Sequence, residues 1–338
     1  MIYVDFVTLG ATGITVNKNG FGALPIQRVD TSAGVYLLKK AFQNGITFFD
    51  SARGYTDSES KIGLALSCVR EKITIATKTN AVDVNAFCND LEVSLNNLQT
   101  DYIDIFQFHN PAFCPRPGDA SGLYDAMQDA KAKGKVRHIG ITNHRIEIAR
   151  EAAESGLYET IQYPISYLAT EQEIEFVRLC AEKNISVIAM KGLSGGLITD
   201  AAAAYAFMMQ FDNVIPIWGI QRESELDEFI ACQNTTPSLD ERAKRVIEKD
   251  RVELSGEFCR GCGYCLPCPA GIGIPLAARM TAFIKRASEK FYLGDSCREA
   301  MRYAADCTNC GQCTTKCPYG INAPKLIRES WEVFQKLI

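Results

Sequence analysis

The sequence lacks any apolar run long enough to cross a bilayer, since the best candidate, AAAAYAFMM at residues 201–209, has about half of the ~20 residues that a membrane helix needs. The first residues, MIYVDFVTLGATG, contain neither a basic segment nor an apolar signal core. We therefore expect a cytoplasmic protein without a membrane partner.

A strong charge of one sign is also missing. The formal net charge is −4 over 338 residues, which argues against nucleic acid as the main partner. The hydrophobic content of 47% and the charged content of 22% are ordinary for a globular protein, and the length suits one large domain and one small one. No heptad repeat is present, so the sequence leaves the oligomeric state open.

Cysteine, in contrast, is abundant and clustered. The chain has 14 cysteines, and eight of them lie in two short segments, CRGCGYCLPCPAG at 259–271 and CTNCGQCTTKCPYG at 307–320. In a reducing compartment, clustered thiols favour metal binding over disulfide formation. The two segments therefore predict a metal-binding region.

The spacing of these cysteines indicates the kind of metal site. The second segment reads C-x2-C-x2-C-x3-CP, the spacing of bacterial two-cluster ferredoxins, and the first is one residue shorter in its last gap. Three thiolates in such a segment bind one cluster, and the fourth, before proline, reaches the other. Zinc is the alternative, but structural zinc sites typically use paired C-x2-C hooks. We predict two [4Fe-4S] clusters, one on Cys259, Cys262, Cys265 and Cys317, the other on Cys307, Cys310, Cys313 and Cys268.

The first two thirds of the chain alternate between apolar strand-like runs and helix-period segments. Eight units of strand and helix, joined by right-handed crossovers, predict a (β/α)8 TIM barrel. A doubly wound open sheet is the alternative, although no dinucleotide-binding glycine fingerprint follows the first strand. The predicted strands are 20–24, 46–50, 72–78, 102–109, 136–142, 160–164, 185–191 and 213–219, and helical patterns include 33–43, 84–98, 124–133 and 173–183.

The predicted organisation is α/β, with an N-terminal hairpin before the barrel and a small, α-rich, ferredoxin-like two-cluster domain after it. We assign residues 1–232 to the barrel, 233–256 to a polar linker with a helical stretch, and 257–338 to the cluster domain. Helical periodicity at 275–292 and an amphipathic pattern at 323–338 give that last domain its helices.

Polar residues end several of the predicted barrel strands, where barrel enzymes place their chemistry. Asp50, Lys78 and His109 end three strands, and Thr142 and Asn143 follow a fourth. An aspartate or histidine at such a position also has a purely structural explanation, as a cap or a satisfied core residue. A lysine that closes the apolar run ITIATK is costly unless its ammonium meets a carboxylate or performs a task.

Four segments, FFDSARGYTDSESKIGLAL, IATKT, VSLNNLQTDYIDIFQFHNP and GKVRHIGITNH, resemble the aldo-keto reductases along roughly residues 5–230. The resemblance places the family's catalytic tetrad on Asp50, Tyr55, Lys78 and His109. It implies reduction of a carbonyl by hydride from NADPH or NADH, with Tyr55 as general acid and Lys78 as the cation that makes the phenol a stronger acid. Asp50 would pair with Lys78, and His109 would orient the carbonyl oxygen.

The same resemblance implies a nicotinamide site with an amide-binding set, a residue against the nicotinamide ring, a glycine-rich turn for the pyrophosphate and a cation for a 2′-phosphate. The chain departs from the family where Glu225 and Phe229 stand at the positions of the usual basic residue and terminal asparagine. This departure leaves the choice between NADPH and NADH open. The predicted cofactor-binding residues are Thr142, Asn143, Gln162, Met190, Gly192, Leu193, Gly195 and Arg222.

The expected substrate is a small carbonyl compound, an aldehyde, a ketone or a keto-sugar, which the sequence does not name. We expect the loop at 110–119 to shape its pocket together with Leu24, Gln27 and Trp218. These positions are inferred from their place near strand ends.

A hydride carries two electrons, whereas an iron–sulfur cluster passes one at a time, and no flavin-binding signature connects the two. Aldo-keto reductases with such a C-terminal region form a subgroup, and three functions fit it. The first is a nicotinamide-dependent carbonyl reductase, and the second is a reductase whose clusters supply electrons from a ferredoxin-like donor or pass them to an acceptor. The third is a redox sensor without turnover, against which the intact tetrad argues.

Overall fold

The computed structural model describes residues 5–254, 258–287 and 289–338. Its strands are β1 Phe6–Thr8, β2 Thr15–Asn17, β3 Gly20–Gly22, β4 Phe48–Asp50, β5 Thr74–Thr79, β6 Ile103–His109, β7 Val136–Thr142, β8 Thr160–Pro164, β9 Ser186–Met190 and β10 Val214–Gly219. The α-helices between or after the strands are α1 Thr31–Gln43, α2 Ser58–Leu66, α3 Val84–Leu98, α4 Leu123–Ala132, α5 Ile146–Ser155, α6 Glu171–Glu182, α7 Ala201–Met209, α8 Glu223–Thr235 and α9 Glu241–Glu253. Those of the C-terminal part are α10 Ile274–Ala277, α11 Met280–Arg286, α12 Glu289–Tyr292, α13 Asp295–Ala304, α14 Gln312–Thr315 and α15 Ala323–Phe334.

The chain forms two compact units, which are described separately. The first comprises Met1–Gly192 and Ala201–Lys244, and the second comprises Leu193–Asp200 and Arg245–Ile338. The loop after β9 thus belongs to the second unit, although the chain before and after it belongs to the first. The predicted boundary between residues 256 and 257 lies outside the described residues, and the predicted domain limits stay predictions.

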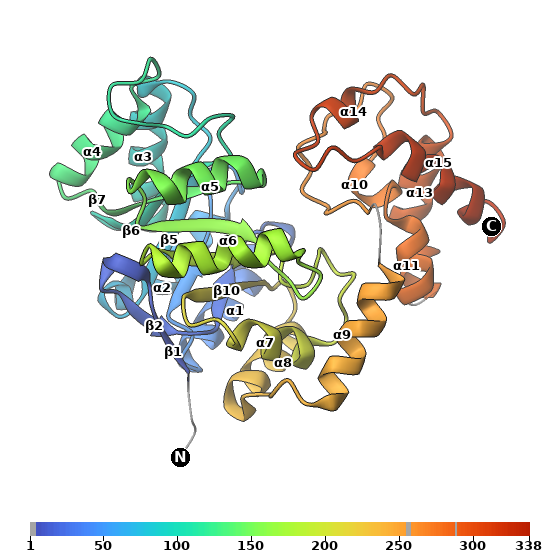
Figure 1. The fold of residues 1–338 in the computed structure, drawn as a ribbon, viewed down its shortest axis with the longest axis horizontal. Helices are drawn as coiled ribbons and strands as arrows, with labels where there is room; N and C mark the ends of the chain where they lie inside the picture. Colours follow the sequence, from blue (N-terminus) through green and yellow to red (C-terminus); the bar gives the residue numbers. More distant parts are fainter. Residues whose placement is uncertain (1–4, 255–257, 288) are drawn as a thin grey trace. The chain divides into compact units, whose positions relative to one another are not determined.

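The first unit contains a closed barrel of eight parallel strands surrounded by helices (Figure 1). The strands follow one another in the order β10-β3-β4-β5-β6-β7-β8-β9. Strand β10 pairs with both β3 and β9, which closes the sheet. The predicted (β/α)8 barrel is confirmed, and the open doubly wound sheet is wrong. The predicted strand at 46–50 begins only at Phe48, because the Ile46 amide still bonds the Ala41 carbonyl at the end of α1.

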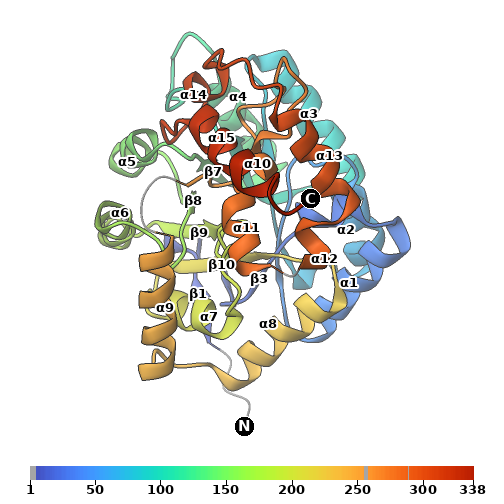
Figure 2. The same ribbon diagram turned by 90° about the vertical axis from the view of Figure 1, so that its right-hand side faces the viewer.

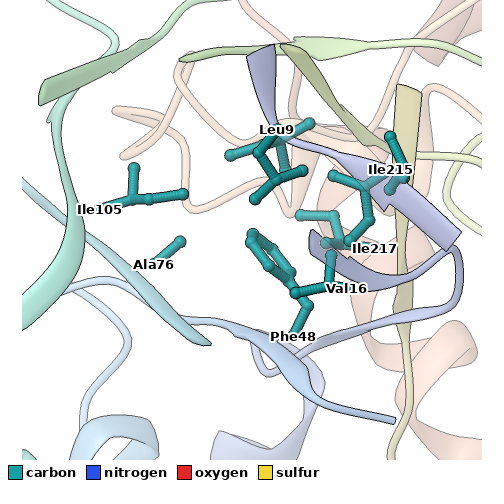
Figure 3. Close-up of a cluster of buried hydrophobic side chains, with 9 residues drawn as sticks. Leu9, Val16, Phe48, Ala76, Ile105, Ile215 and Ile217 are labelled. Carbon is teal, nitrogen blue, oxygen red and sulfur yellow. The ribbon is translucent and has the colours of Figure 1, made fainter. Parts of the chain in front are cut away.

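A hydrophobic cluster fills the barrel beneath the carboxyl ends of its strands (Figure 3). Two of its residues, Val7 and Val16, come from the antiparallel hairpin β1–β2, and Leu9 follows that hairpin's first strand. The strands contribute inward side chains at alternate positions, since a strand presents every second residue to one face. The cluster consists of Val7, Leu9, Val16, Phe48, Ala76, Ile105, Ile188, Ile215 and Ile217.

Local sequence signals explain where the barrel helices begin. The side chain of Asp30 accepts a hydrogen bond from the Ala33 amide at the start of α1, and Asp83 does the same for Ala86 in α3. Thr170 and Glu173 form a reciprocal capping box at α6. Each cap satisfies amides that a helix leaves unpaired at its first turn.

The described part of the second unit is mainly helical between the loop at 193–200 and the cysteine-rich loops (Figure 2). Helix α15 packs against α10, α11, α13 and α14 within this unit. The unit's core includes Met280, Phe283, Met301, Ile327 and Phe334, all less than a tenth exposed. Among the helices that the structure describes, none is long and apolar enough to span a membrane.

Candidate functional site

Three polar side chains lie directly above the hydrophobic cluster inside the barrel. Asp50 on β4, Lys78 on β5 and Gln107 on β6 each stand two residues after a member of the cluster. Because strand residues alternate between faces, these side chains point into the barrel at its carboxyl end. The fold thereby converts three separate strand ends into one buried polar layer.

Lys78 and Asp50 form a buried ion pair. The Lys78 ammonium donates to the two Asp50 carboxylate oxygens at 2.7 and 2.8 Å and to the Ser51 carbonyl at 2.5 Å. Lys78 is 0% exposed and Asp50 is 2% exposed. Burial lowers the pKa of Lys78 and raises the pKa of Asp50, and the attraction between the two charges opposes both effects.

Tyr55 and His109 lie beside this pair. The Lys78 ammonium is 5.3 Å from the centre of the Tyr55 ring, and the rings of Tyr55 and His109 meet edge to face with centroids 5.8 Å apart. Burial lowers the pKa of His109 to about 3, with a further contribution from the nearby Lys78 charge. His109 is therefore a neutral imidazole near pH 7. The structure thus brings together the four residues of the predicted tetrad.

A second buried carboxylate, Glu59, acts electrostatically on Lys78. It was not identified from the sequence. Glu59 is 1% exposed and accepts hydrogen bonds from the hydroxyls of Thr77 and Ser94, both at 2.7 Å, and from the Arg53 guanidinium at 2.6 Å. Its negative charge raises the pKa of Lys78 against the larger lowering effect of burial. A glutamate inside the first turn of α2, just after the tyrosine loop, was the available signal.

The predicted nicotinamide residue Gln162 shares the polar layer with the ion pair. Its side-chain carbonyl accepts from the Gln107 amide at 2.9 Å, and its own amide donates to Asp50 at 3.4 Å. Gln107 was also missed, although its place two residues before His109 on the same strand predicts the same inward direction. Gln107 thus holds the Gln162 side chain, which in turn contacts Asp50.

Thr142 and Met190 also meet at the strand ends. The Thr142 hydroxyl donates to the Met190 sulfur at 3.9 Å. Asn143, 0% exposed, donates to the Pro111 carbonyl at 2.9 Å and accepts from the Arg145 amide at 2.9 Å. These contacts fix Asn143 between β7 and the predicted pocket loop at 110–119.

Arg222, predicted to meet a 2′-phosphate, is held by a carboxylate. Its guanidinium donates to Glu225 at 2.5 Å, and Glu225 also accepts from the Gln221 and Arg222 amides at the start of α8. The pair neutralises the cation at this position. Glu225 therefore changes the electrostatics of the place where the family resemblance expects a basic residue.

Trp218 does not face the barrel interior, contrary to the prediction that it shapes the pocket. It follows Ile217 of the hydrophobic cluster, so it points outward, and its ring stacks on Phe229 at 4.2 Å and on Tyr205 at 6.3 Å between centroids. A Cβ on Gly192 would come within 2.6 Å of the indole. Gly192 and Phe229 are thus tied to packing around this tryptophan.

The cysteines of the second unit lie in two neighbourhoods. Burial raises the pKa of Cys265 to about 12, and the adjacent Cys259 and Cys262 add to the effect. Cys268 lines a pocket together with the thiols of the other segment and with Cys265. The thiols lining that pocket are Cys265, Cys268, Cys307, Cys310 and Cys313.

Arg260 connects the ends of the two cysteine segments. Its guanidinium lies 4.5 Å from the Phe258 ring centre and 5.5 Å from that of Tyr319, two residues after Cys317. Among the described residues, no three His, Cys, Asp or Glu side chains are grouped to hold a single metal ion. A four-iron cluster takes each thiolate on a different iron, so its ligands stand farther apart than those of one ion. The all-thiolate donor set and the glycines beside it fit such a cluster.

Comparisons with known proteins agree with this architecture. Residues 18–203 match the aldo/keto reductase family, and residues 258–322 match the 4Fe-4S dicluster domain. L-galactose dehydrogenase of Arabidopsis thaliana is 29% identical over 219 residues, which cover 59% of this chain and 69% of that protein. The NADH-specific methylglyoxal reductase of Escherichia coli is 28% identical over 223 residues, with coverages of 57% and 68%.

A solved structure of an aldo-keto reductase from Bacillus halodurans superposes with a TM-score of 0.65 at 20% identity, covering 73% of this chain and 96% of that one. This likeness supports the barrel fold. With more than half of the chain matched, the protein belongs to the aldo/keto reductase family. It is an oxidoreductase of that family with a 4Fe-4S dicluster domain at residues 258–322.

Proposed function

We propose that the protein reduces a small aldehyde, ketone or keto-sugar by hydride transfer from a nicotinamide nucleotide, with Tyr55 as the general acid. The observation that carries this proposal is the half-buried Tyr55 ring 5.3 Å from the Lys78 ammonium, which is itself anchored to Asp50. A phenol is a stronger acid when a nearby cation stabilises the phenolate that it becomes. Lys78 stabilises the Tyr55 phenolate in this way.

Each residue of the site has a distinct task in the proposed reaction. A bound nicotinamide nucleotide supplies the hydride, which carries two electrons to the carbonyl carbon. Tyr55 gives its hydroxyl proton to the carbonyl oxygen, so the product is an alcohol, and solvent returns the proton to the phenolate. His109, neutral because its pKa is lowered to about 3, donates a hydrogen bond toward the same oxygen and orients it.

For the nicotinamide itself, we propose Thr142, Asn143, Gln162 and Met190 around the ring and its carboxamide, with Gly192, Leu193 and Gly195 near the pyrophosphate. The hydroxyl and amides at the strand ends have the right chemistry for a carboxamide. The Arg222–Glu225 pair weighs against a 2′-phosphate, because the carboxylate repels it and occupies the guanidinium. NADH is therefore the better donor in this proposal.

In the second unit we propose two [4Fe-4S] clusters, on Cys259, Cys262, Cys265 and Cys317 and on Cys307, Cys310, Cys313 and Cys268. Burial raises the pKa of Cys313, and the thiols that add to this effect are Cys307 and Cys268, which supports the exchange of the fourth ligand between segments. Cys310 is exposed, so a cluster there would lie at the surface of this unit. That exposure favours a second candidate function, in which a ferredoxin-like donor or acceptor exchanges single electrons with the clusters.

Tyr55→Phe tests the main proposal. In protein purified without oxygen, we expect the rate of NADH-dependent carbonyl reduction to fall by about 10²–10⁴-fold, while the Kd for NADH stays within about two-fold. Tyr303→Phe, at an exposed tyrosine of α13, is the matched control and should retain full activity. Full activity in Tyr55→Phe contradicts the acid role, and turnover only with a reduced one-electron dye supports the second candidate.

A further inference from the structure

The loop between β9 and α7, residues 193–200, connects two barrel elements but is part of the second unit. It forms this compact unit with residues 245–338. Its backbone takes positive φ angles at Ser194, Gly195 and Gly196, of 47°, 68° and 92°. Glycine adopts such angles freely, whereas Ser194 holds one only when its surroundings determine it. This loop is the one that we propose to lie at the pyrophosphate.

Arg279, at the start of α11, is the side chain that holds the loop. Its guanidinium donates to the Gly195 carbonyl at 2.8 Å and to the Pro275 carbonyl at 2.6 Å. It packs on the Phe283 ring at 4.9 Å. A Cβ on Gly195 would lie 2.5 Å from a guanidinium nitrogen, so only glycine admits the arginine at this distance.

The same guanidinium also rests against the first cysteine segment. A Cβ on Gly261, between Cys259 and Cys262, would lie 2.8 Å from the central carbon of Arg279. The Gly261 amide donates to the Cys259 sulfur at 3.4 Å. Arg279 is therefore enclosed between the backbone of a cysteine loop and the backbone of the loop at 193–200.

Arg286, about two turns beyond Arg279 at the end of α11, makes a second contact with the loop. It donates to the Leu197 carbonyl at 2.9 Å, while its other nitrogen is held by Asp250 and Glu253, both at 2.7 Å. The two acidic partners fix the direction of the guanidinium and balance its charge. The loop is thus bound at two carbonyls by two arginines of the same helix region.

We propose that Arg279 and Arg286 are positioning residues for the nicotinamide-binding loop, and that occupation of the cysteine site beside Gly261 keeps Arg279 in place. This inference rests on the proposed function of the loop. Thiolates bound at Cys259 and Cys262 fix the backbone of Gly261 against the guanidinium, which in turn fixes Gly195. When these contacts are lost, the loop at 193–200 becomes more mobile and dinucleotide binding weakens, while the tetrad residues keep their places.

Arg279→Gln in the cluster-loaded protein is the principal test. We expect hydrogen exchange of residues 193–200 to accelerate and the Kd and KM for NADH to rise about ten-fold, with a smaller change in kcat. Arg279→Lys keeps the charge but not the planar fork, so it should recover only part of the affinity. Arg298→Gln is the control, because that arginine also donates to a carbonyl, Leu293, but does not contact the loop.

Two glycine variants distinguish the contacts of Arg279 with Gly195 and Gly261, which we call the clamp, from an effect of backbone strain. Gly261 and Gly263 both have positive φ, of 66° and 87°, but only at Gly261 would a Cβ meet Arg279, whereas nothing lies within 4 Å at Gly263. Gly261→Ala should therefore raise loop exchange and the Kd for NADH well beyond Gly263→Ala. Cluster content, from absorbance and electron paramagnetic resonance, is measured for each variant.

The outcomes distinguish this inference from the function on which it rests. Unchanged loop exchange in Arg279→Gln and equal behaviour of the two alanine variants overturn the clamp. Failure of the wild-type protein to bind any nicotinamide nucleotide overturns the proposed function instead, and accelerated loop exchange in Arg279→Gln still supports the clamp in that case.

Discussion

The candidate sites of the barrel and of the cysteine-rich unit differ in where their polar groups find partners. In the barrel, each charge of the site meets a partner from the chain itself, as Lys78 meets Asp50 and Glu59 meets Arg53. In the second unit, the eight thiols of the two cysteine segments, with Cys313 on α14 and the others between helices, fit a group that the chain does not encode. We therefore expect the barrel to hold its site from its own sequence, whereas the second unit depends on iron and sulfide.

Iron removal gives the largest expected contrast between the two units. Chelation under reducing conditions should abolish protection against hydrogen exchange across residues 258–338 while the strands of the barrel stay protected. Cys310→Ser should lower the iron content, and Cys88→Ser, at an exposed cysteine of α3, should not. Equal loss of protection in both units would break the comparison.

Asp50→Asn tests the barrel's reliance on internal partners. Removing one member of a buried ion pair leaves Lys78 uncompensated, so we expect the free energy of unfolding of the barrel to fall by about 3–5 kcal/mol. Asp101→Asn, at an exposed carboxylate, should change it by less than about 0.5 kcal/mol. Denaturant unfolding monitored in the barrel measures both, and similar stability of the two variants contradicts the role of the pair.

His109 gives the barrel a pH dependence with a defined sign. Because burial lowers its pKa to about 3 from its usual value near 6.5, the unfolded chain binds the proton more readily, and stability falls as pH drops from about 6.5 to about 3. Above about pH 6.5, His109 is neutral in both the folded and the unfolded chain, so it does not lower the free energy of unfolding. His109→Gln should lose less stability over the same window, by an amount on the order of a few kcal/mol, and parallel stability curves for the two proteins contradict this.

Glu225→Gln has the smallest expected effect and sharpens the electrostatic account of the barrel's cofactor site. With the carboxylate gone, Arg222 is free to meet a 2′-phosphate. We expect the ratio of NADPH to NADH affinity to rise by about five-fold, the factor for an exposed pair of ~1 kcal/mol. Glu241→Gln, at an exposed pair on α9, is the control. If the ratio of NADPH to NADH affinity does not change, Arg222 does not bind the 2′-phosphate.

The sequence by itself predicted the barrel, because eight apolar strand runs alternate with helix-period segments. The missing glycine fingerprint after the first strand argued against the open doubly wound sheet. The ends of apolar strands marked Asp50, Lys78 and His109 as candidates, and the family resemblance added Tyr55. The cysteine spacing likewise identified the iron–sulfur region without any structure.

Only the tertiary structure decided which side chains surround those candidates. The positions of Glu59 and Gln107 suggest only a direction for each side chain. Their partners, and those of Arg53, depend on how neighbouring strands and α2 meet in the closed barrel. Trp218 turned outward because strand parity is fixed by register, which a short apolar run does not reveal. The capture of Gly195 by Arg279 joins residues 84 positions apart, and contacts at such distance in the chain depend on packing that local sequence patterns do not encode.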